Sequence, residues 1–299
     1  MYTMYIKPLE EILTKLNVQF HLYADDCVIY LSFQGENSTE TQARLNACLT
    51  EINIWMTENF LKLNTDKTKL QVFNPRSRID DFQLKYEDEN INCDNLVCML
   101  GVKLKNNINF DDFISQKIRA CNFHLRNLWH IKNGLSLEAR VILVTNLILT
   151  TLDYCNGILI NSTKKRLKPL QIVLNKAIRF IFNLRRRTHI TSFLRKLHIL
   201  PIAFRIRYKV CLIGFKIFNN ISPPYLSDQF NKFHSTSSMP LRVGRDDYMF
   251  KTELQKKESI FSSMKLEWNK LPIRIRNTTS TDSFKSKLKT FLFGEAFPE

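Results

Sequence analysis

Two adjacent carboxylates, Asp25 and Asp26, are the residues of this 299-residue chain whose types and spacing could do chemistry. Carboxylate oxygens are the ligands that hard divalent cations such as Mg²⁺ prefer, so a neighbouring pair could help to hold such an ion. Asp also favours turns, because its side chain hydrogen-bonds to nearby backbone groups. The pair is therefore either a metal site or a solvated turn rich in Asp.

The residues on both sides of the pair predict a hairpin that presents it at the tip. Upstream, Val18, Phe20 and Leu22 alternate with polar or amphipathic residues, and downstream the β-rich run 27–33 continues. Alternation with a period of two indicates strands, and an acidic turn can join them. A strand, a turn and a strand hold metal ligands more rigidly than a long loop does.

The segment Tyr23-Ala24-Asp25-Asp26 resembles the catalytic box of reverse transcriptases. Later segments resemble further motifs of the enzymes of non-LTR (LINE-type) retrotransposons. These segments are residues 55–56, 61–68, 100–102, 152–156, 189–191, 197–201 and 223–226. An ordered series along nearly the whole chain is more specific than one match of four residues.

This resemblance implies a role for each matching residue. Asp25 and Asp26 would be catalytic and would hold Mg²⁺. Lys67 would lie near the leaving pyrophosphate, as a proton donor or an electrostatic stabiliser, although a plain exposed lysine is the alternative. The primer grip, where a glycine lets backbone approach closely or merely turns a strand, would be formed by Leu100, Gly101 and Val102.

One part of the family pattern is missing. In this family a further aspartate comes from a strand upstream of the catalytic box, but the acids before Asp25 are Glu10 and Glu11, in a predicted helix. Transfer with two metal ions needs carboxylates from more than one strand. The chain thus resembles the C-terminal palm and thumb portion of a reverse transcriptase without its N-terminal half. Either a fragment of an RNA-directed DNA polymerase or a catalytically dead nucleic-acid-binding remnant would fit this pattern.

The net charge of +16 is concentrated in one segment. Between Tyr154 and Ser227 there are fifteen Lys or Arg residues and no Asp or Glu, whereas the rest of the chain has 29 basic and 28 acidic residues. Such a segment attracts polyanions, so nucleic acid is the first candidate partner and an anionic membrane surface the second. The predicted nucleic-acid-binding residues are Lys168, Lys176, Arg179, Arg185, Arg186, Arg187, Arg205, Arg207 and Lys209.

The resemblance makes this segment a thumb, which would follow a duplex of RNA template and DNA primer through its phosphates. Phosphate contacts position a duplex without reading its sequence, which suits an enzyme that copies any template. Deoxynucleotides would be further partners of the completed enzyme, and no membrane partner is expected.

The expected fold class is α+β. A partial polymerase palm, with an antiparallel hairpin sheet and helices, is expected in residues 1–110. A basic, mainly helical thumb-like bundle would follow in residues 111–230, and residues 231–299 would form a C-terminal extension of unknown role.

Apolar periodicity and cap residues predict the individual elements. Helices are expected near residues 6–16, 38–56, 114–128, 136–148, 167–181 and 206–217. Residues 69–73 are expected as a strand, and residues 74–98 as an exposed hairpin or insertion without an assigned function.

Several other classes of site and compartment are disfavoured. Seven cysteines without a Cys-x-x-Cys pair argue against a disulfide framework and a zinc ribbon. His189 and His198 lack an accompanying nucleophile and acid, so we expect capping or packing roles. The longest apolar stretch, residues 141–152, is too short to cross a bilayer, and no signal-peptide pattern is present, so we expect an intracellular protein, cytoplasmic or nuclear.

Overall fold

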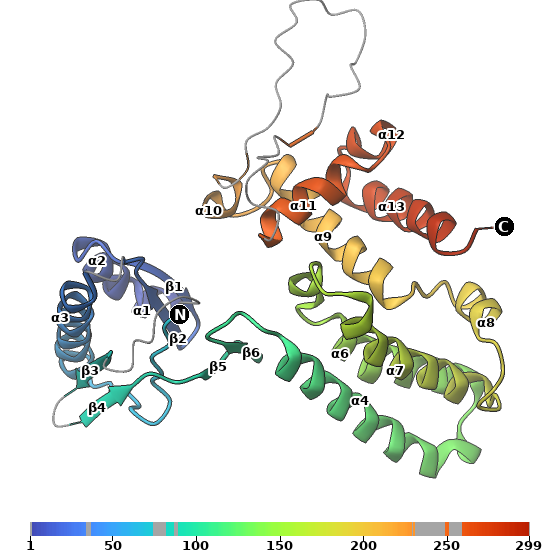
Figure 1. The fold of residues 1–299 in the computed structure, drawn as a ribbon, viewed down its shortest axis with the longest axis horizontal. Helices are drawn as coiled ribbons and strands as arrows, with labels where there is room; N and C mark the ends of the chain where they lie inside the picture. Colours follow the sequence, from blue (N-terminus) through green and yellow to red (C-terminus); the bar gives the residue numbers. More distant parts are fainter. Residues whose placement is uncertain are drawn as a thin grey trace, which may run out of the picture. The chain divides into compact units, whose positions relative to one another are not determined.

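The structure is a computed structural model. It describes residues 2–33, 37–73, 82–86, 89–228, 230, 249–250 and 259–298. In this part of the chain, α-helices are combined with three two-stranded antiparallel sheets, which confirms the α+β class (Figure 1). The chain divides into two compact units, Met1–Phe113 and Ile114–Glu299, which we call the hairpin unit and the helical unit.

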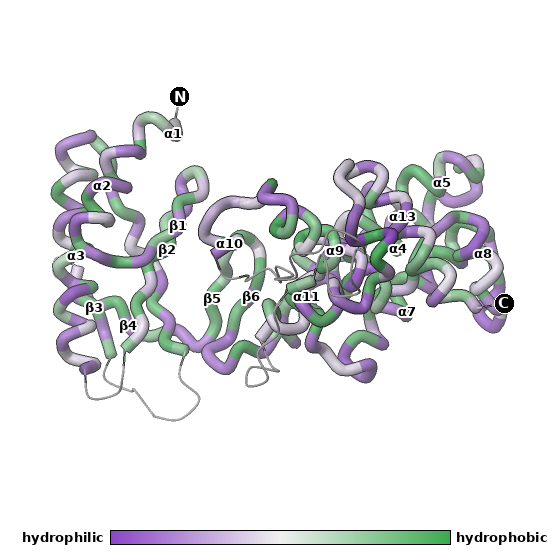
Figure 2. Tube along the Cα trace, turned by 90° about the horizontal axis from the view of Figure 1, so that it is seen from above, coloured by the Kyte–Doolittle hydropathy of each residue, from purple (hydrophilic) through white to green (hydrophobic). Residues whose placement is uncertain are grey.

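The hairpin unit begins with two helices and the predicted hairpin. Helix α1 (Tyr2–Tyr5) precedes α2 (Lys7–Lys15), which has a proline in its first turn, where the missing N–H leaves no hydrogen bond unmade. Strand β1 (Gln19–Tyr23) pairs antiparallel with β2 (Asp26–Tyr30). Helix α3 (Ser38–Glu58) follows, and its tube in Figure 2 alternates between hydrophobic and hydrophilic residues, as expected for an amphipathic helix.

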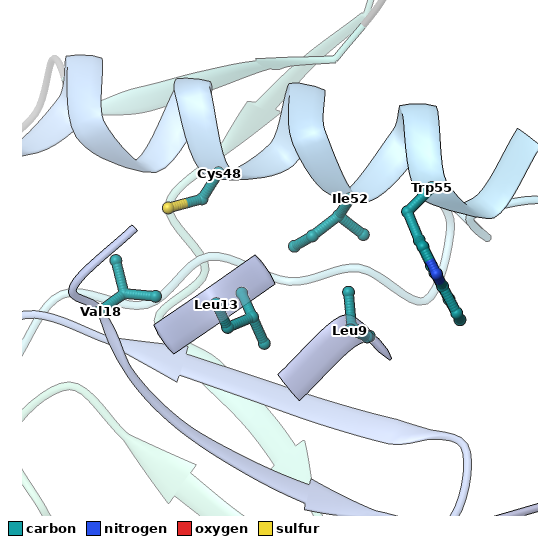
Figure 3. Packing of buried hydrophobic residues seen from close by; sticks show 6 residues of the cluster. All are labelled: Leu9, Leu13, Val18, Cys48, Ile52 and Trp55. Atoms are coloured by element: carbon teal, nitrogen blue, oxygen red, sulfur yellow. The ribbon is translucent and has the colours of Figure 1, made fainter. Parts of the chain in front are cut away.

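A hydrophobic cluster joins these elements and supports the hairpin (Figure 3). Leu9 and Leu13, one turn apart on α2, face Ile52 and Trp55 of α3. The cluster is completed by Val18 and Cys48, and the apolar side chains Phe20, Leu22 and Ile29 of the hairpin pack against it. One face of the hairpin is therefore held by the core, which fixes the strand register.

A second cluster in the hairpin unit corrects the expectation that residues 74–98 are exposed. Strand β3 (Gln83–Tyr86) pairs with β4 (Glu89–Asn92), and Leu84, Tyr86 and Ile91 are buried against α3 residue Leu49. The predicted hairpin is thus present in the described part of residues 74–98, but one of its faces is packed and not exposed. Residues 74–81 and 87–88 lie outside the described residues.

Residues 69–73 do not form the predicted strand. Only Leu70 makes a β-bridge, to Cys93, and its side chain joins the second cluster. The Gln71 side chain donates instead to the carbonyl oxygen of Leu104, at 2.9 Å. The alternating pattern of this segment was misleading because a strand also needs a neighbour along its length, and none is present among the described residues.

The last hairpin of this unit is formed by β5 (Leu96–Met99) and β6 (Val102–Lys105). It contains residues 100–102 in and beside its turn. Lys105 pairs with Asp112 at 2.7 Å, so the end of the hairpin is tied to the start of the following helix.

The helical unit contains most of α4 (Asp111–Ile131), which ends in the 3₁₀ turn η2 (Lys132–Gly134). Next come α5 (Leu137–Leu143), the π-helical turn η3 (Val144–Leu149) and α6 (Thr150–Asp153), which continue one another. The Ser136 side chain accepts a hydrogen bond from the Ala139 N–H and caps α5, as its residue type predicts.

The basic segment forms the next part of the helical unit. After the 3₁₀ turn η4 (Asn156–Leu159), α7 (Lys164–Phe182) is capped by Thr163. Helices α8 (Thr191–Lys196), α9 (Ile202–Phe218) and α10 (Pro224–Ser227) follow. Helix α7 buries seven side chains on one face, so it is a central element of this unit.

The end of the chain packs on α9. Helices α11 (Ile260–Asn269), α12 (Ile273–Arg276) and α13 (Thr281–Ala296) form this part, which belongs to the helical unit. The Trp268 ring is fully buried and lies 5.7 Å from the Phe284 ring, whose centroid is in turn 4.3 Å from that of Phe215 on α9.

All seven cysteines are free thiols. Over the described residues, no helix has both the length and the apolar character that a membrane span requires.

Candidate functional site

The carboxylate pair lies at the tip of the β1–β2 hairpin, as predicted. Tyr23 and Asp26 are paired across the strands, so Ala24 and Asp25 form a two-residue turn between them. Ala24 has a φ of 52°, in the left-handed region that costs a residue with a Cβ atom about 1 kcal/mol. Strain of this kind is often kept where function needs a fixed backbone.

The register places Asp26 on the face of the hairpin that points away from the core. Tyr23, His21 and Tyr30 share this face with Asp26, because residues two apart on a strand point to the same side. The Tyr23 side chain is 67% exposed. His21 Nε2 and the Tyr30 hydroxyl are 3.2 Å apart and their rings stack, so the outer face is aromatic and polar near its acid.

Asp25 and Asp26 are both exposed. Neither side chain makes a hydrogen bond or an ion pair with another residue that the structure describes. Hydrogen bonding within the fold therefore does not account for these acids, and their oxygens are available to an external cation. Their chemistry fits Mg²⁺, which is commonly held by one or two carboxylates together with substrate phosphates and water.

The pair alone does not complete a site for two ions. In the described part of the chain, no group of three or more His, Cys, Asp or Glu side chains could hold a metal ion together. Strands β1 and β2 pair only with each other among the described strands, so both edges of this hairpin present backbone groups to which a further strand could bind.

Lys67 lies in a turn after α3, and its side chain is exposed. Its backbone N–H donates to the Asn64 side chain at 3.1 Å, which fixes the turn. No hydrogen bond joins Lys67 to Asp25 or Asp26. The structure thus shows an accessible ammonium in the same unit as the acids, without direct contact between them.

The predicted primer-grip residues form a strained hairpin tip. Leu100 and Gly101 are the two turn residues and have φ values of 46° and 76°. Two consecutive positive φ values are typical of a type I′ turn, which prefers Asn-Gly. Gly101 meets this demand easily, whereas Leu100 is strained and 41% exposed. Val102, by contrast, is buried.

Five of the nine predicted nucleic-acid-binding cations are exposed. These residues are Lys168, Lys176, Arg185, Arg186 and Arg187. The last three follow the C-terminal end of α7, where positive charge also interacts favourably with the helix dipole. Two further members are half-buried: Arg179, which donates to the carbonyl oxygen of Thr188 at 3.3 Å, and Lys209.

The remaining two predicted nucleic-acid-binding cations, Arg205 and Arg207, are paired with carboxylates. Arg205 contacts Asp153 through two donor nitrogens, one of them at 2.8 Å. Arg207 donates to Glu267 and to Glu295, each at 2.7 Å. Burial raises the pKa of Glu267, but hydrogen bonds from Lys270 and Arg207 outweigh burial and lower it. These acids lie outside the acid-free segment, so the sequence pattern did not reveal the pairing.

One buried lysine, near the ion pair of Arg205 with Asp153, was not predicted from the sequence. Lys117 on α4 is 4% exposed, and its ammonium donates to the carbonyl oxygens of Thr151 and Tyr154, each at 2.6 Å. Burial lowers its pKa to about 8, although the nearby Cys155, Cys121 and Asp153 act against that shift. Lys117 satisfies the last carbonyl groups of α6, a structural role that its position on the apolar face of α4 could have suggested.

The two histidines that drew attention in the sequence are exposed. His198 follows α8 with a φ of 51°, and its ring lies 5.5 Å from that of Phe293.

Comparisons with models of known protein families, with curated proteins and with solved structures find no match. The function is therefore inferred from the residues and their geometry.

Proposed function

We propose that this chain is part of a reverse transcriptase, an RNA-directed DNA polymerase of a non-LTR retrotransposon. The observation that carries this proposal is the Tyr-Ala-Asp-Asp segment at the tip of a hairpin, with both acids exposed and engaged by no other described side chain. A core fixes the inner face of this hairpin and leaves the outer face to a substrate. The hairpin unit would be a partial palm and the helical unit a thumb.

In this proposal Asp25 and Asp26 hold Mg²⁺ in the completed enzyme. The bound ions would activate the attacking hydroxyl group and stabilise the leaving group. Lys67 would provide positive charge or a proton to the leaving pyrophosphate, and its exposed ammonium is compatible with that role. The strained turn at Leu100 and Gly101 would bring backbone close to the primer end.

The five exposed cations of the predicted set would bind the duplex of RNA template and DNA primer through its phosphates, and deoxynucleotides would be the other substrates. These residues are Lys168, Lys176, Arg185, Arg186 and Arg187. The absence of any acid between Tyr154 and Ser227 supports a polyanion as the partner. The free thiols suit a reducing compartment, so we propose that the protein acts in the cytoplasm or the nucleus.

A catalytically dead nucleic-acid-binding remnant is the second candidate. It is favoured by the contrast between the acid pair, which has no third carboxylate beside it in the described residues, and the well-packed basic helices. The DNA upstream of the codon for Met1 would distinguish the two candidates. An in-frame segment encoding fingers and a further strand with an aspartate would favour the enzyme.

Salt dependence of duplex binding tests the common part of the proposal. Each neutralised phosphate releases condensed counterion, so contacts with about five phosphates should give a slope near −4.5 for log K against log salt concentration on B-form DNA. Replacing Arg185, Arg186 and Arg187 together by Ala should flatten the slope by about two to three units if all three contact phosphate. Asp25→Ala should leave the slope unchanged.

Fluorescence anisotropy with a labelled duplex would measure these slopes, with an RNA–DNA heteroduplex expected to behave similarly. Sequence preference should be weak, because phosphate contacts do not read bases. An affinity insensitive to salt would contradict nucleic-acid binding by the basic segment. A slope unaltered by the triple substitution would assign this arginine run to a solvated surface.

A further inference from the structure

Two basic helices lie side by side and run in the same direction in the helical unit, α4 and α7 (Figure 1). Three contacts along their length show this arrangement. The Lys176 ammonium donates to the Asn122 side chain at 3.3 Å, and the Trp129 and Phe180 rings meet edge to face at 5.6 Å. Nearer the C-terminal ends, the Lys132 ammonium contacts Asn183.

The two helices share an unusual charge pattern. Helix α4 has acids only in its first turn, Asp111 and Asp112, and α7 has none. Solvated helix faces normally mix both signs of charge. Helix α4 therefore adds basic residues beside α7 that lie outside the basic segment of the sequence, Arg119 and Arg126.

The spacing of these cations puts them on one surface. Arg119 and Arg126 lie one turn before and one turn after Asn122, the residue that contacts Lys176 of α7. Lys165 and Lys176 are three turns apart on the same side of α7, about 16 Å along the helix at 1.5 Å per residue. All four side chains are exposed. The Lys176 ammonium is bonded to Asn122, and the other three side chains have no partner among the described residues.

We propose that these four residues, Arg119, Arg126, Lys165 and Lys176, form one surface that binds the sugar-phosphate backbone of a nucleic acid. This inference rests on the proposed function, and it adds two α4 residues outside the basic segment. Phosphates of one strand advance about 3.4 Å per nucleotide, so a strip of about 16 Å spans several phosphates.

Apolar side chains between the cations favour a nucleic acid over a small anion. Phe123 is 60% exposed between Arg119 and Arg126, and Ile172 is 44% exposed between Lys165 and Lys176. A sugar or an unpaired base offers an apolar face to such side chains, whereas free phosphate does not. Arg205 and Arg207 do not belong to this surface, because carboxylates already neutralise them.

The test compares charge removal on this surface with equal removal elsewhere in the same unit. In the full chain, Arg119→Gln with Arg126→Gln should flatten the salt slope for a labelled duplex by about 1.8 units, because two phosphate contacts are lost. Arg119→Lys with Arg126→Lys should restore nearly the whole slope. The matched control is Lys216→Gln with Lys289→Gln, two exposed lysines on α9 and α13, which should retain the wild-type slope.

The outcomes separate this inference from the proposed function. If the wild type shows salt-dependent binding and the Arg119/Arg126 glutamine variant has the same slope as the wild type, the α4–α7 surface is overturned while nucleic-acid binding stands. If the wild type itself shows no salt-dependent binding, the proposed function fails. Tighter binding to phosphatidylserine vesicles than to duplex, lost in the glutamine variant, would overturn nucleic acid as the occupant. Circular dichroism of each variant would verify that the helices are intact.

Discussion

Asp25 and Asp26 of the hairpin unit differ from Asp153 of the helical unit in almost every respect. Asp153 is half-buried, contacts the Arg205 guanidinium and accepts a hydrogen bond from Asn156 at 3.2 Å. The hairpin acids are exposed at a strained turn and make no side-chain bond with another described residue. The half-buried Asp153 is explained by its ion pair, whereas the exposed acids form either a solvated turn or a cation site, the two alternatives that the sequence leaves open.

The supporting structure differs in the same way. The hairpin has two strands with unpaired edges among the described strands, and only its inner face has a core. In the helical unit, α7 buries seven side chains on one face, and the fully buried Trp268 ring stacks on Phe218 of α9. Phosphate binding needs positive charge on a stable surface, but chemistry needs ligands converging within a fraction of an ångström. The helical unit, for which we propose phosphate binding, thus has a more extensive packed interior than the β1–β2 hairpin.

The largest effect is expected at the hairpin acids in a fusion that supplies polymerase fingers and a further strand with an aspartate. Asp25→Ala or Asp26→Ala should then reduce primer extension by at least about a thousandfold, since these acids would hold the charge of the transition state. Duplex affinity should change little, because in the proposal the helical unit would supply the ground-state binding. Extension assays and anisotropy on the same variants would measure both quantities.

The chain without the added half is the control for this prediction. It should extend no primer with Mg²⁺ or Mn²⁺, because the carboxylates of one hairpin cannot assemble a two-ion site. Template-dependent incorporation that Asp25→Asn abolishes would contradict this expectation. Equal losses of binding and activity in the alanine variants would instead assign the acids to folding.

An intermediate effect is expected at Lys117, the buried cation of the helical unit. Its ammonium has a pKa of about 8 in the folded chain and an ordinary value of 10.5. Between these values the unfolded state binds more protons, so the contribution of Lys117 makes the unfolding free energy rise with pH. The rise should be about 1 kcal/mol between about pH 7.5 and 9, measured by urea denaturation.

Comparison of variants would isolate this contribution from other titrating groups. Lys117→Met should lack the rise, whereas Lys216→Met, at an exposed lysine, should keep it. Parallel curves for the wild type and Lys117→Met would mean that the Lys117 ammonium is solvated. The helical unit would then be more open to water than its burial indicates.

The smallest effect compares two helical glycines in the helical unit. A Cβ atom at Gly294 of α13 would meet nothing within 4 Å, so Gly294→Ala should stabilise the chain by about 0.5 kcal/mol. At Gly214 of α9 it would lie 3.3 Å from Trp268 Cε3. Gly214→Ala should therefore destabilise slightly, because the fully buried Trp268 ring must shift to make room for the methyl group. Equal stabilisation by both substitutions, in thermal unfolding, would show that the interior around Trp268 is loosely packed.

The sequence by itself determined the local features of this protein. The alternation around Asp25 and Asp26 predicted two strands with the acids in their turn, and the register confirms it. Ser136 marked a helix start because a hydroxyl caps the orphan N–H groups of the first turn. These features depend on neighbours within a few residues, which a sequence shows directly.

Only the tertiary structure decided which charges and strands meet. Residues 69–73 have a strand-like pattern but remain unpaired except at Leu70, because pairing requires a partner from elsewhere in the chain. Arg205 and Arg207 lie in an acid-free segment, yet Asp153, Glu267 and Glu295 neutralise them. Helix α4 lies outside that segment and is placed beside α7 by packing. Coulomb attraction depends on distance in space and not on separation in sequence, so the folded chain alone fixes which positive charges stay available to a partner.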